Sequence, residues 1–422
     1  METFIYWSFL CVFMEDAISI LEKWNPWKKK MDSGIKRKSY LKKIYPYMER
    51  KEVIVLKGVR RSGKSTIVKQ LIAQLIEDGI DKNQILYINL EEYAFADNLS
   101  IGLFDELMNA YKEYSKNKKR AYVFVDEVQK IPSWEKWIRT KYDLDENIKF
   151  VITGSSASLL SKELSTLLTG RNISFTIMPL SFVEYMAFTK SGDLEGYLQF
   201  GGFPEVVLEK SEEKKTMLLQ QYFEDIVHKD VIDRYSIRNT KQIMDLARYL
   251  VSVSGSKLSV NKLSRVFGVA KDTLQSYVNY MLDAYLLFEV TYFSYSAKVK
   301  HDISKLPKMY CMDNGFVNIV NTKYAKNRGQ MFENTVFIKL AEDYKEISYW
   351  GEVDSEVYFI VEKTAINVTS TDKIPVREFK GLDDFGRKNK GFDSWVVSDN
   401  LTKENVISIT DFLKQTKFHS VP

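Results

Sequence analysis

The chain has 422 residues, 45% of them hydrophobic and 28% charged, which excludes a fibrous or disordered protein and leaves room for two or three packed domains. Its 61 basic and 56 acidic residues give a net charge of +5, a mild excess that neither requires nor excludes a nucleic-acid partner. Two cysteines in the whole chain exclude a disulfide framework, so we expect a protein of the reducing cytoplasm.

Residues 1–35 are expected to form an amino-terminal extension. Residues 4–13 are almost wholly apolar, but this patch is too short to span a bilayer and lacks the basic start and the cleavage site of a signal peptide. We expect no membrane association and take Met14 as the initiator, with a short membrane anchor as the alternative. The lysine-rich residues 28–43 are expected on a helix, which favours a solvated face over a grip on phosphate backbones.

A phosphate-binding loop follows the first predicted strand. The apolar residues 53–56 lead into Gly58-Val59-Arg60-Arg61-Ser62-Gly63-Lys64-Ser65, and a periodic helix begins near Thr66. Loops of this kind wrap backbone N–H groups around phosphate oxygens, while the following helix directs its positive dipole end at them. The sequence therefore predicts that residues 58–66 bind ATP.

Lys64 and Ser65 have defined roles in such a loop. Lys64 is expected to reach the β- and γ-phosphates, and the Ser65 hydroxyl to bind a Mg²⁺ ion that bridges them. The other members of the predicted ATP-binding set are Gly58, Arg60, Arg61, Ser62, Gly63 and Thr66. Thr66 is expected mainly as a helix residue, whereas the two arginines are expected to contact either phosphate or a neighbouring subunit.

A second motif supplies carboxylates. Residues 121–125 form an apolar run typical of a buried parallel strand, and Asp126 and Glu127 follow it. At the carboxyl end of such a strand, Asp126 is expected to hold Mg²⁺, directly or through water, and Glu127 to orient and deprotonate the attacking water. An acidic turn without function is the alternative.

Two further residues are candidates for sensing and catalysis. The third strand, residues 148–153, runs into Ser155, which is placed as a sensor of the γ-phosphate or as a helix cap. Arg171 could stabilise the charge of the transferring phosphoryl group, and a surface ion pair is the alternative for it. An arginine that acts between subunits would require oligomers.

Several motifs together extend along most of the chain: Val59–Thr66, Phe124–Gln129, Ile152–Ser156, Thr169–Arg171, Pro179–Tyr185 and Tyr197–Glu205. In these motifs the chain resembles the predicted AAA-type ATPases found widely in archaea and bacteria, from about Met14 onward. The resemblance implies an ATP-binding core followed by a terminal module of unknown function. We expect a P-loop ATPase domain at 36–215, a helical or winged-helix domain at 216–320 and a terminal domain at 321–422.

The middle domain contains a predicted helix-turn-helix. Residues 259–269 and 271–278 are expected as helix, tight turn and helix, and strands near 286–290 and 308–310 would complete a winged helix. The second helix offers a mixed set of polar side chains: Lys271, Gln275, Asn279, Asp272 and Asp283. DNA binding and a structural or protein-contact role therefore stay equal alternatives.

The last segment resembles the restriction-endonuclease-type nuclease fold that often closes this family. Such nucleases need carboxylates to hold Mg²⁺ and a lysine to position water. Tyr358, Asn367 and Thr369 occupy the places of the aspartate, the glutamate and the lysine, so Glu333 alone remains of the expected carboxylates. We expect a degenerate nuclease fold used for binding or assembly.

The sequence thus predicts an α/β protein with a P-loop AAA-type parallel sheet core, a winged-helix region and a degenerate nuclease-like α/β domain. The expected function is Mg²⁺-dependent ATP hydrolysis that drives a conformational switch. A DNA-binding protein gated by ATP is the first alternative, and an active nuclease is the second. Candidate partners besides ATP are DNA, another protein and a second copy of the chain.

Overall fold

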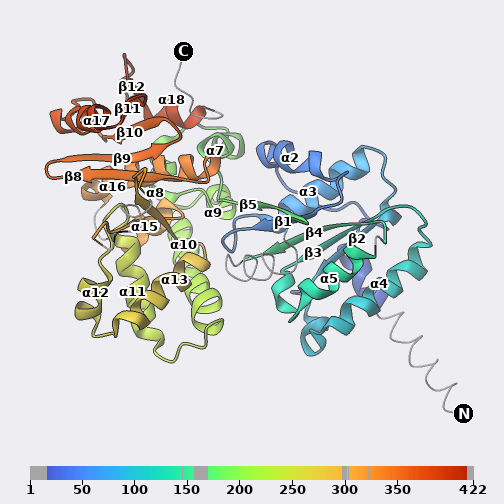
Figure 1. The fold of residues 1–422 in the computed structure, drawn as a ribbon. Coiled ribbons are helices and arrows are strands. Elements are labelled where there is room, and N and C mark those ends of the chain that lie inside the picture. The colour runs from blue at the N-terminus through green and yellow to red at the C-terminus, as the bar shows by residue number, and fades with distance from the viewer. Residues whose placement is uncertain are drawn as a thin grey trace, which may run out of the picture. The chain divides into compact units, whose positions relative to one another are not determined.

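The computed structural model describes residues 17–144, 146–155, 170–296, 302, 304–321 and 324–415, with the side chains of residues 324–327 left out. These residues form two compact units, which Figure 1 colours along the chain. The first unit comprises Met1–Gly58 and Gly63–Ile177, and the second comprises Val59–Ser62 and Met178–Pro422. The finer boundaries expected at residues 215 and 320 stay predictions.

A five-stranded sheet lies at the centre of the first unit, with the order β2-β3-β4-β1-β5 and every neighbouring pair parallel. The strands are β1 (Val53–Lys57), β2 (Ile85–Asn89), β3 (Ala121–Asp126), β4 (Ile148–Gly154) and β5 (Asn172–Thr176). Because all five run in one direction, their carboxyl ends meet at one edge of the sheet. Strand β4 lies between β1 and β3, so it separates the strand before the phosphate loop from the strand that ends in Asp126.

Helices cover both faces of this sheet (Figure 1). They are α2 (Lys38–Ile44), α3 (Lys64–Glu77), α4 (Ile101–Ser115) and α5 (Trp134–Asp143), with short 3-10 turns η1 (Tyr45–Tyr47), η2 (Lys82–Gln84), η3 (Tyr93–Asn98) and η4 (Val128–Lys130). Successive strand residues point to opposite faces. Ile54 and Leu56 accordingly join the core under α2 and α3, whereas Val53 and Val55 join the core under α4 and α5. The predicted parallel sheet with helices on both faces is confirmed.

The lysine-rich segment differs from its prediction. Residues 17–24 are helical, but Lys28 and Lys29 lie in a turn and bend, and α2 begins only at Lys38. Pro26 explains the break, because a proline disfavours helix in the residue before it and cannot donate a helical hydrogen bond.

The second unit begins with helices, and the first three of them lie inside residues 36–215, the range predicted for the ATPase domain. They are α7 (Phe182–Thr189), α8 (Leu194–Phe200), α9 (Pro204–Leu208), α10 (Glu212–Asp225), the π-helical η5 (Ile226–Asp233), α11 (Thr240–Ser252), α12 (Val260–Phe267), α13 (Lys271–Asp283) and α15 (Asn314–Val320). Helix α12 ends at Gly268, whose φ of +63° reverses the chain before α13. This is the helix, tight turn and helix that the sequence predicts.

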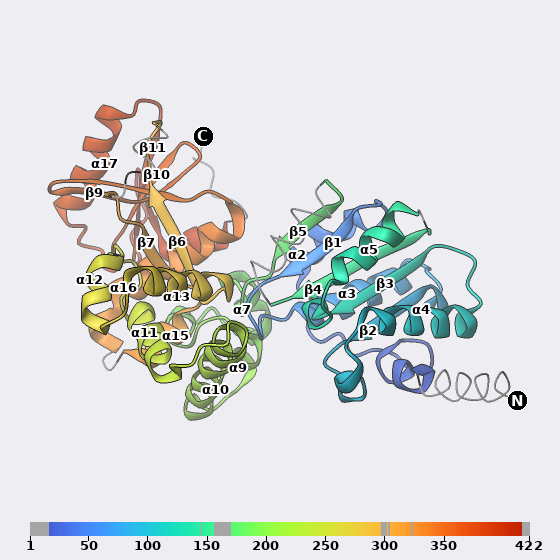
Figure 2. The same ribbon diagram turned by 60° about the horizontal axis from the view of Figure 1, so that its bottom comes forward.

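A seven-stranded mixed sheet completes the second unit, in the order β12-β11-β10-β9-β8-β6-β7. Its strands are β6 (Leu287–Tyr292), β7 (Lys308–Cys311), β8 (Ser348–Glu352), β9 (Ser355–Val361), β10 (Thr364–Val368), β11 (Asp393–Ser398) and β12 (Val406–Ser408), and its helices are α16 (Tyr324–Asp343), α17 (Val376–Lys388) and α18 (Ile409–Lys414). Strands β6 and β7 pair antiparallel, side by side in Figure 2, and β6 also pairs parallel with β8. The two strands expected for a wing are therefore the edge of a sheet that continues past residue 320.

Candidate functional site

The predicted phosphate loop joins β1 to α3 with an unusual backbone. The angle φ is +147° at Gly58, +68° at Arg61 and +95° at Gly63. Position 58 needs glycine because a Cβ there would lie 2.3 Å from the carbonyl oxygen of Ile177. Gly63 is the N-cap of α3, so the loop ends where the first turn of a 14-residue helix exposes its N–H groups. A loop of this geometry can bind an anion.

Lys64 places a positive charge in this loop. It is the first residue of α3, and its side chain is only 4% exposed. Its Nζ donates to the Gly58 carbonyl oxygen at 3.0 Å and lies 3.7 Å from Oε1 of Glu127. The ammonium group is therefore held between the loop and the carboxyl end of β3, where it can neutralise phosphate charge.

Asp126 ends β3 as a buried carboxylate surrounded by hydroxyl groups. The Tyr87 hydroxyl donates to Oδ2 at 2.8 Å, the Thr153 hydroxyl donates to Oδ1, and the Ser65 side chain also bonds to this carboxylate. Burial raises the pKa of Asp126 and the charge of Glu127 raises it further, whereas these hydrogen bonds lower it. The side chains of Tyr87 and Thr153 were missed by sequence reasoning.

The predicted magnesium ligands, Ser65 and Asp126, are brought together by this arrangement. A hydroxyl and a carboxylate are oxygen donors of the kind that Mg²⁺ prefers, and Mg²⁺ commonly takes its remaining ligands from phosphate and water. Within the described ranges, no three or more His, Cys, Asp or Glu side chains are grouped so that they could hold a metal ion. A metal at Ser65 and Asp126 would therefore take its other ligands from phosphate and water. The residues therefore fit a metal that binds together with a nucleotide.

Glu127 follows Asp126 in a strained conformation, with a φ of +56°. Its backbone N–H donates to the Thr153 hydroxyl oxygen at 2.9 Å, and its carboxylate faces Lys64. Thr153 therefore contacts both residues of the acidic pair. The sequence could have indicated this role of Thr153, because it is a hydroxyl residue that follows the apolar residues of β4.

Ser155 joins the same cluster. It lies directly after β4, is fully buried, and its Oγ accepts a hydrogen bond of 3.3 Å from Nε2 of Gln129. The same Nε2 donates to Oε2 of Glu127. The structure thus connects the predicted sensor to the predicted general base through Gln129, which the sequence did not single out. Ser156 and Thr169, quoted among the motifs, lie outside the described residues.

The two loop arginines make ion pairs with protein carboxylates. They belong to Val59–Ser62, which clusters with the second unit. Within that unit, Nε of Arg60 lies 3.1 Å from Oδ2 of Asp230, a carboxylate that is 1% exposed. Arg61 lies 3.8 Å from Glu205 and above the ring of Tyr222. Their predicted contact with phosphate stays a prediction.

Arg171 lies at the other end of the first sheet. Its carbonyl oxygen accepts from the Val53 N–H at the start of β1, and its guanidinium lies 3.2 Å from Asp143. The five residues of β1 separate it from the phosphate loop by roughly 16 Å, at about 3.3 Å per residue. The structure therefore does not bring Arg171 to the loop of its own chain, and a catalytic role for it requires a second copy.

The expected nuclease carboxylate has an internal counter-charge. Tyr310 donates to Oε1 of Glu333 at 2.6 Å, and the buried Nζ of Lys308 lies 3.4 Å from Glu333 and 3.4 Å from Glu356. Burial raises the pKa of Glu333, and the charge of Lys308 opposes that shift. The side chain of Asn367 donates to the backbone oxygens of Glu356 and Glu378. The Lys308 ammonium group thus contacts two carboxylates, those of Glu333 and Glu356.

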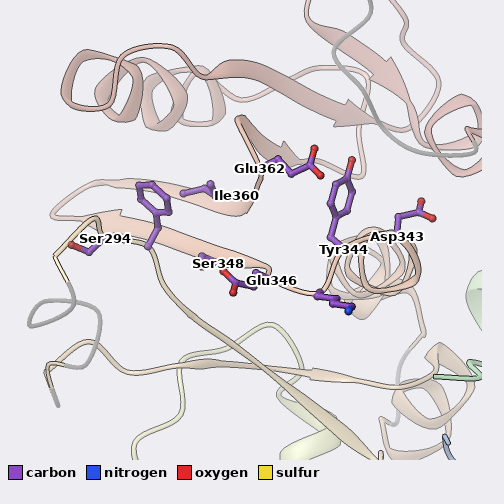
Figure 3. Close-up of a pocket in the computed structure, with 9 residues that line it drawn as sticks. Ser294, Asp343, Tyr344, Glu346, Ser348, Ile360 and Glu362 are labelled. Carbon is purple, nitrogen blue, oxygen red and sulfur yellow. The ribbon is translucent and has the colours of Figure 1, made fainter. Parts of the chain in front are cut away.

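A cavity of about 590 Å³ lies elsewhere in the second unit. Figure 3 shows its lining side chains, which come from the end of α16, from β8 and β9, and from the segments that follow α16, β6 and β9. The lining residues are Phe293, Ser294, Asp343, Tyr344, Lys345, Glu346, Ser348, Ile360 and Glu362. None of them belongs to the predicted site.

Among the described residues, no helix has both the length and the apolarity that crossing a membrane requires.

Comparison with known proteins gives two matching families. Residues 50–186 match the family described as an AAA domain, and residues 191–326 match DUF8612, a domain of unknown function. The uncharacterised protein MJ1544 of Methanocaldococcus jannaschii is 32% identical over 408 residues, covering 86% of this chain and 88% of that protein. An uncharacterised protein of Haemophilus influenzae is 30% identical, covering 78% of this chain and 84% of its own length.

Solved structures were compared as well. The Orc1 protein of Aeropyrum pernix, determined in complex with DNA, aligns with 69% of this chain and 94% of its own with 11% identity. The TM-score of this alignment is 0.30.

Proposed function

This chain carries an AAA domain and belongs to the family that includes MJ1544 of Methanocaldococcus jannaschii, and from this premise we propose that it is a Mg²⁺-dependent ATPase whose turnover drives a conformational switch. The observation that supports the proposal most directly is the meeting of Lys64, Asp126 and Glu127 at the carboxyl edge of a parallel sheet. Each has the chemistry that phosphoryl transfer from ATP requires.

Hydrolysis would proceed by attack of water on the γ-phosphorus. The new bond forms between the water oxygen and that phosphorus, and the bond to the β–γ bridging oxygen breaks, so ADP leaves with the electron pair. Glu127 takes the proton of the water, while Lys64 balances the charge of the phosphates. Bound Mg²⁺, held by Ser65 and Asp126, would supply further positive charge to the phosphate oxygens.

The decisive experiment compares three proteins with wild type: Lys64→Ala, Glu127→Gln and, as a matched control, Lys69→Ala. Lys69 lies on the same helix beyond its first turn. Binding of a fluorescent ATP analogue and release of inorganic phosphate are measured with Mg²⁺, each with and without double-stranded DNA. We expect Lys64→Ala to lose binding, Glu127→Gln to bind without turnover, and Lys69→Ala to behave as wild type. Unchanged binding and turnover in both site variants would refute the proposal.

The conformational part of the proposal needs a separate measurement. Residues 59–62 cluster with the second unit, where Arg60 pairs with Asp230, and the proposed switch would act through these residues. Hydrogen exchange of the chain in Glu127→Gln, with and without Mg-ATP, should show altered protection in residues 178–415. Protection changes confined to residues 53–177 would exclude a switch.

DNA binding gated by ATP is retained as a second function because of the exposed face of α13. Lys271, Gln275 and Asn279 are exposed there at four-residue spacing, whereas Leu274 and Val278 on the same helix are buried. Such a face can enter a major groove. Fluorescence anisotropy with duplex DNA should then detect binding that the double variant Gln275→Ala/Asn279→Ala loses.

The terminal domain is proposed to act in binding or assembly and not as a nuclease. The support is the Lys308 ammonium among the carboxylates around Glu333, where a metal-dependent nuclease needs a divalent cation. Incubation with plasmid DNA and Mg²⁺ or Mn²⁺ should yield no cutting, and cutting that Glu333→Ala abolishes would overturn this part.

A further inference from the structure

Gln129 lies in the short turn that directly follows Asp126 and Glu127. Glu127 has a left-handed φ of +56°, and Val128–Lys130 form the single 3-10 turn η4. This sharp turn brings the Gln129 side chain to Oε2 of Glu127, to which Nε2 donates a hydrogen bond. A non-glycine residue in this backbone region is strained, and strain of this kind concentrates at functional sites.

The same amide reaches a second strand. Nε2 of Gln129 also donates to Oγ of Ser155, at 3.3 Å. An amide nitrogen has two hydrogens, so one group can hold both oxygens at once. Glu127 and Ser155 come from the ends of neighbouring strands β3 and β4. Gln129 therefore ties the general base of the proposed reaction to the proposed γ-phosphate sensor.

The other end of the Gln129 amide is a hydrogen-bond acceptor. Oε1 of Gln129 is buried and, within the described part of the chain, has no hydrogen-bond partner. The orientation of the amide is fixed, because an ionised carboxylate accepts hydrogen bonds only and must face the NH₂ group. A buried acceptor without a partner is costly and rare in native proteins, which points to use during the reaction.

We infer that Gln129 is a positioning residue for ATP hydrolysis, which holds the Glu127 carboxylate in register with Ser155 and presents Oε1 to the attacking water. The inference rests on the proposed ATPase function. A water at this place would donate one hydrogen to Glu127 and the other to Oε1, which orients a lone pair of its oxygen for attack. When Ser155 turns to a γ-phosphate, the shared amide transmits that change to Glu127.

The test compares Gln129→Leu with wild type and with Gln74→Leu. Leucine keeps the approximate size but removes both polar atoms. Gln74 is a matched control, because its Nε2 also donates to a carboxylate, at 3.0 Å to Asp78, on the far part of α3. We expect Gln129→Leu to lower kcat at least about tenfold, a part of the 10²- to 10⁴-fold that a general base supplies, with an unchanged dissociation constant for Mg-ATP. Gln74→Leu should leave both values unchanged.

A double variant tests the connection to Ser155. If the two residues act as one unit, Gln129→Leu/Ser155→Ala should lower kcat by little more than the larger of the two single effects. Multiplicative effects would overturn the coupling. A merely structural role would lower ATP affinity and the unfolding temperature together with kcat, and that pattern would also overturn the inference.

The outcomes separate this inference from the function on which it rests. Wild-type turnover that Lys64→Ala abolishes and Gln129→Leu leaves intact would refute the role of Gln129 alone. Absence of turnover in wild type under every condition would refute both.

Discussion

Thr153 illustrates how much of the proposed site depends on one hydroxyl. It donates to Asp126 and accepts from the Glu127 N–H, so it fixes the carboxylate that would hold metal and the backbone turn that presents the general base. It is fully buried. A group that both donates and accepts is needed here, because one partner is a carboxylate and the other an N–H.

Replacement of Thr153 by valine should therefore be costly. Thr153→Val keeps the shape and removes the hydroxyl, so we expect a loss of about 1–3 kcal/mol in the free energy of unfolding and a lower kcat for ATP hydrolysis. Urea unfolding and phosphate release measure the two effects. Thr153→Ser keeps the hydroxyl and should recover most of kcat; equal values for the valine and serine variants would show that the hydroxyl has no such role.

At the scale of elements, Asp313 connects two segments of the second unit. Its Oδ2 accepts from the Gly202 N–H at 2.7 Å, and its Oδ1 accepts from the Gly315 N–H at 2.8 Å at the start of α15. A Cβ at Gly201 would lie 1.7 Å from this carboxylate, which explains the glycine there. The glycine pair at 201–202 thus leaves room for the buried carboxylate of Asp313 and donates a hydrogen bond to it.

The titration of Asp313 should affect stability. Burial raises its pKa from 3.8 to about 7, so the native state binds this proton more tightly than the unfolded state does. The resulting stabilisation is complete below about pH 4 and is lost as the pH rises through about 7. Urea unfolding between pH 4 and 8 should therefore show a falling contribution that Asp313→Asn removes. The same pH dependence in this variant would contradict the assignment. Asn should also cost about 1–3 kcal/mol, because it offers one oxygen to two N–H groups.

At the scale of the whole molecule, the position of Arg171 limits how catalysis can be organised. It directly precedes β5, at the end of the strands away from the phosphate loop, and pairs with Asp143. The side chain of Arg171 is too short to extend along the whole length of β1. Within one chain, Arg171 therefore cannot stabilise charge at the phosphate loop.

Arg171→Ala should accordingly leave ATP hydrolysis within about twofold of wild type at protein concentrations where the chain is a monomer, since a surface ion pair contributes little to stability. Phosphate release and light scattering across a dilution series provide the measurement. A large loss in Arg171→Ala that appears only where wild type oligomerises would establish the arginine as a group supplied by a second copy.

The local parts of this protein were predictable from its sequence. The phosphate loop, the strand before it, the acidic pair after β3 and the helix, turn and helix at α12 and α13 each lie within one short stretch of chain. Glycine positions, apolar runs and periodicity act over such distances, so the residues themselves indicate the element. The parallel sheet followed from the apolar runs at residues 53–56 and 121–125, which require cover on both faces.

Only the tertiary structure decided which distant side chains meet. Thr153 contacts Asp126 over 27 positions, Tyr87 contacts it over 39, and Gln129 contacts Ser155 over 26. These contacts exist because β3 pairs with β2 on one side and with β4 on the other, and strand order depends on how whole elements pack. Arg171 shows the opposite outcome. Its motif predicted a catalytic residue, but the structure places it at the end of the sheet away from the phosphate loop. The sequence therefore determined which residue types form the proposed site, whereas the order of the strands decided which other side chains they contact.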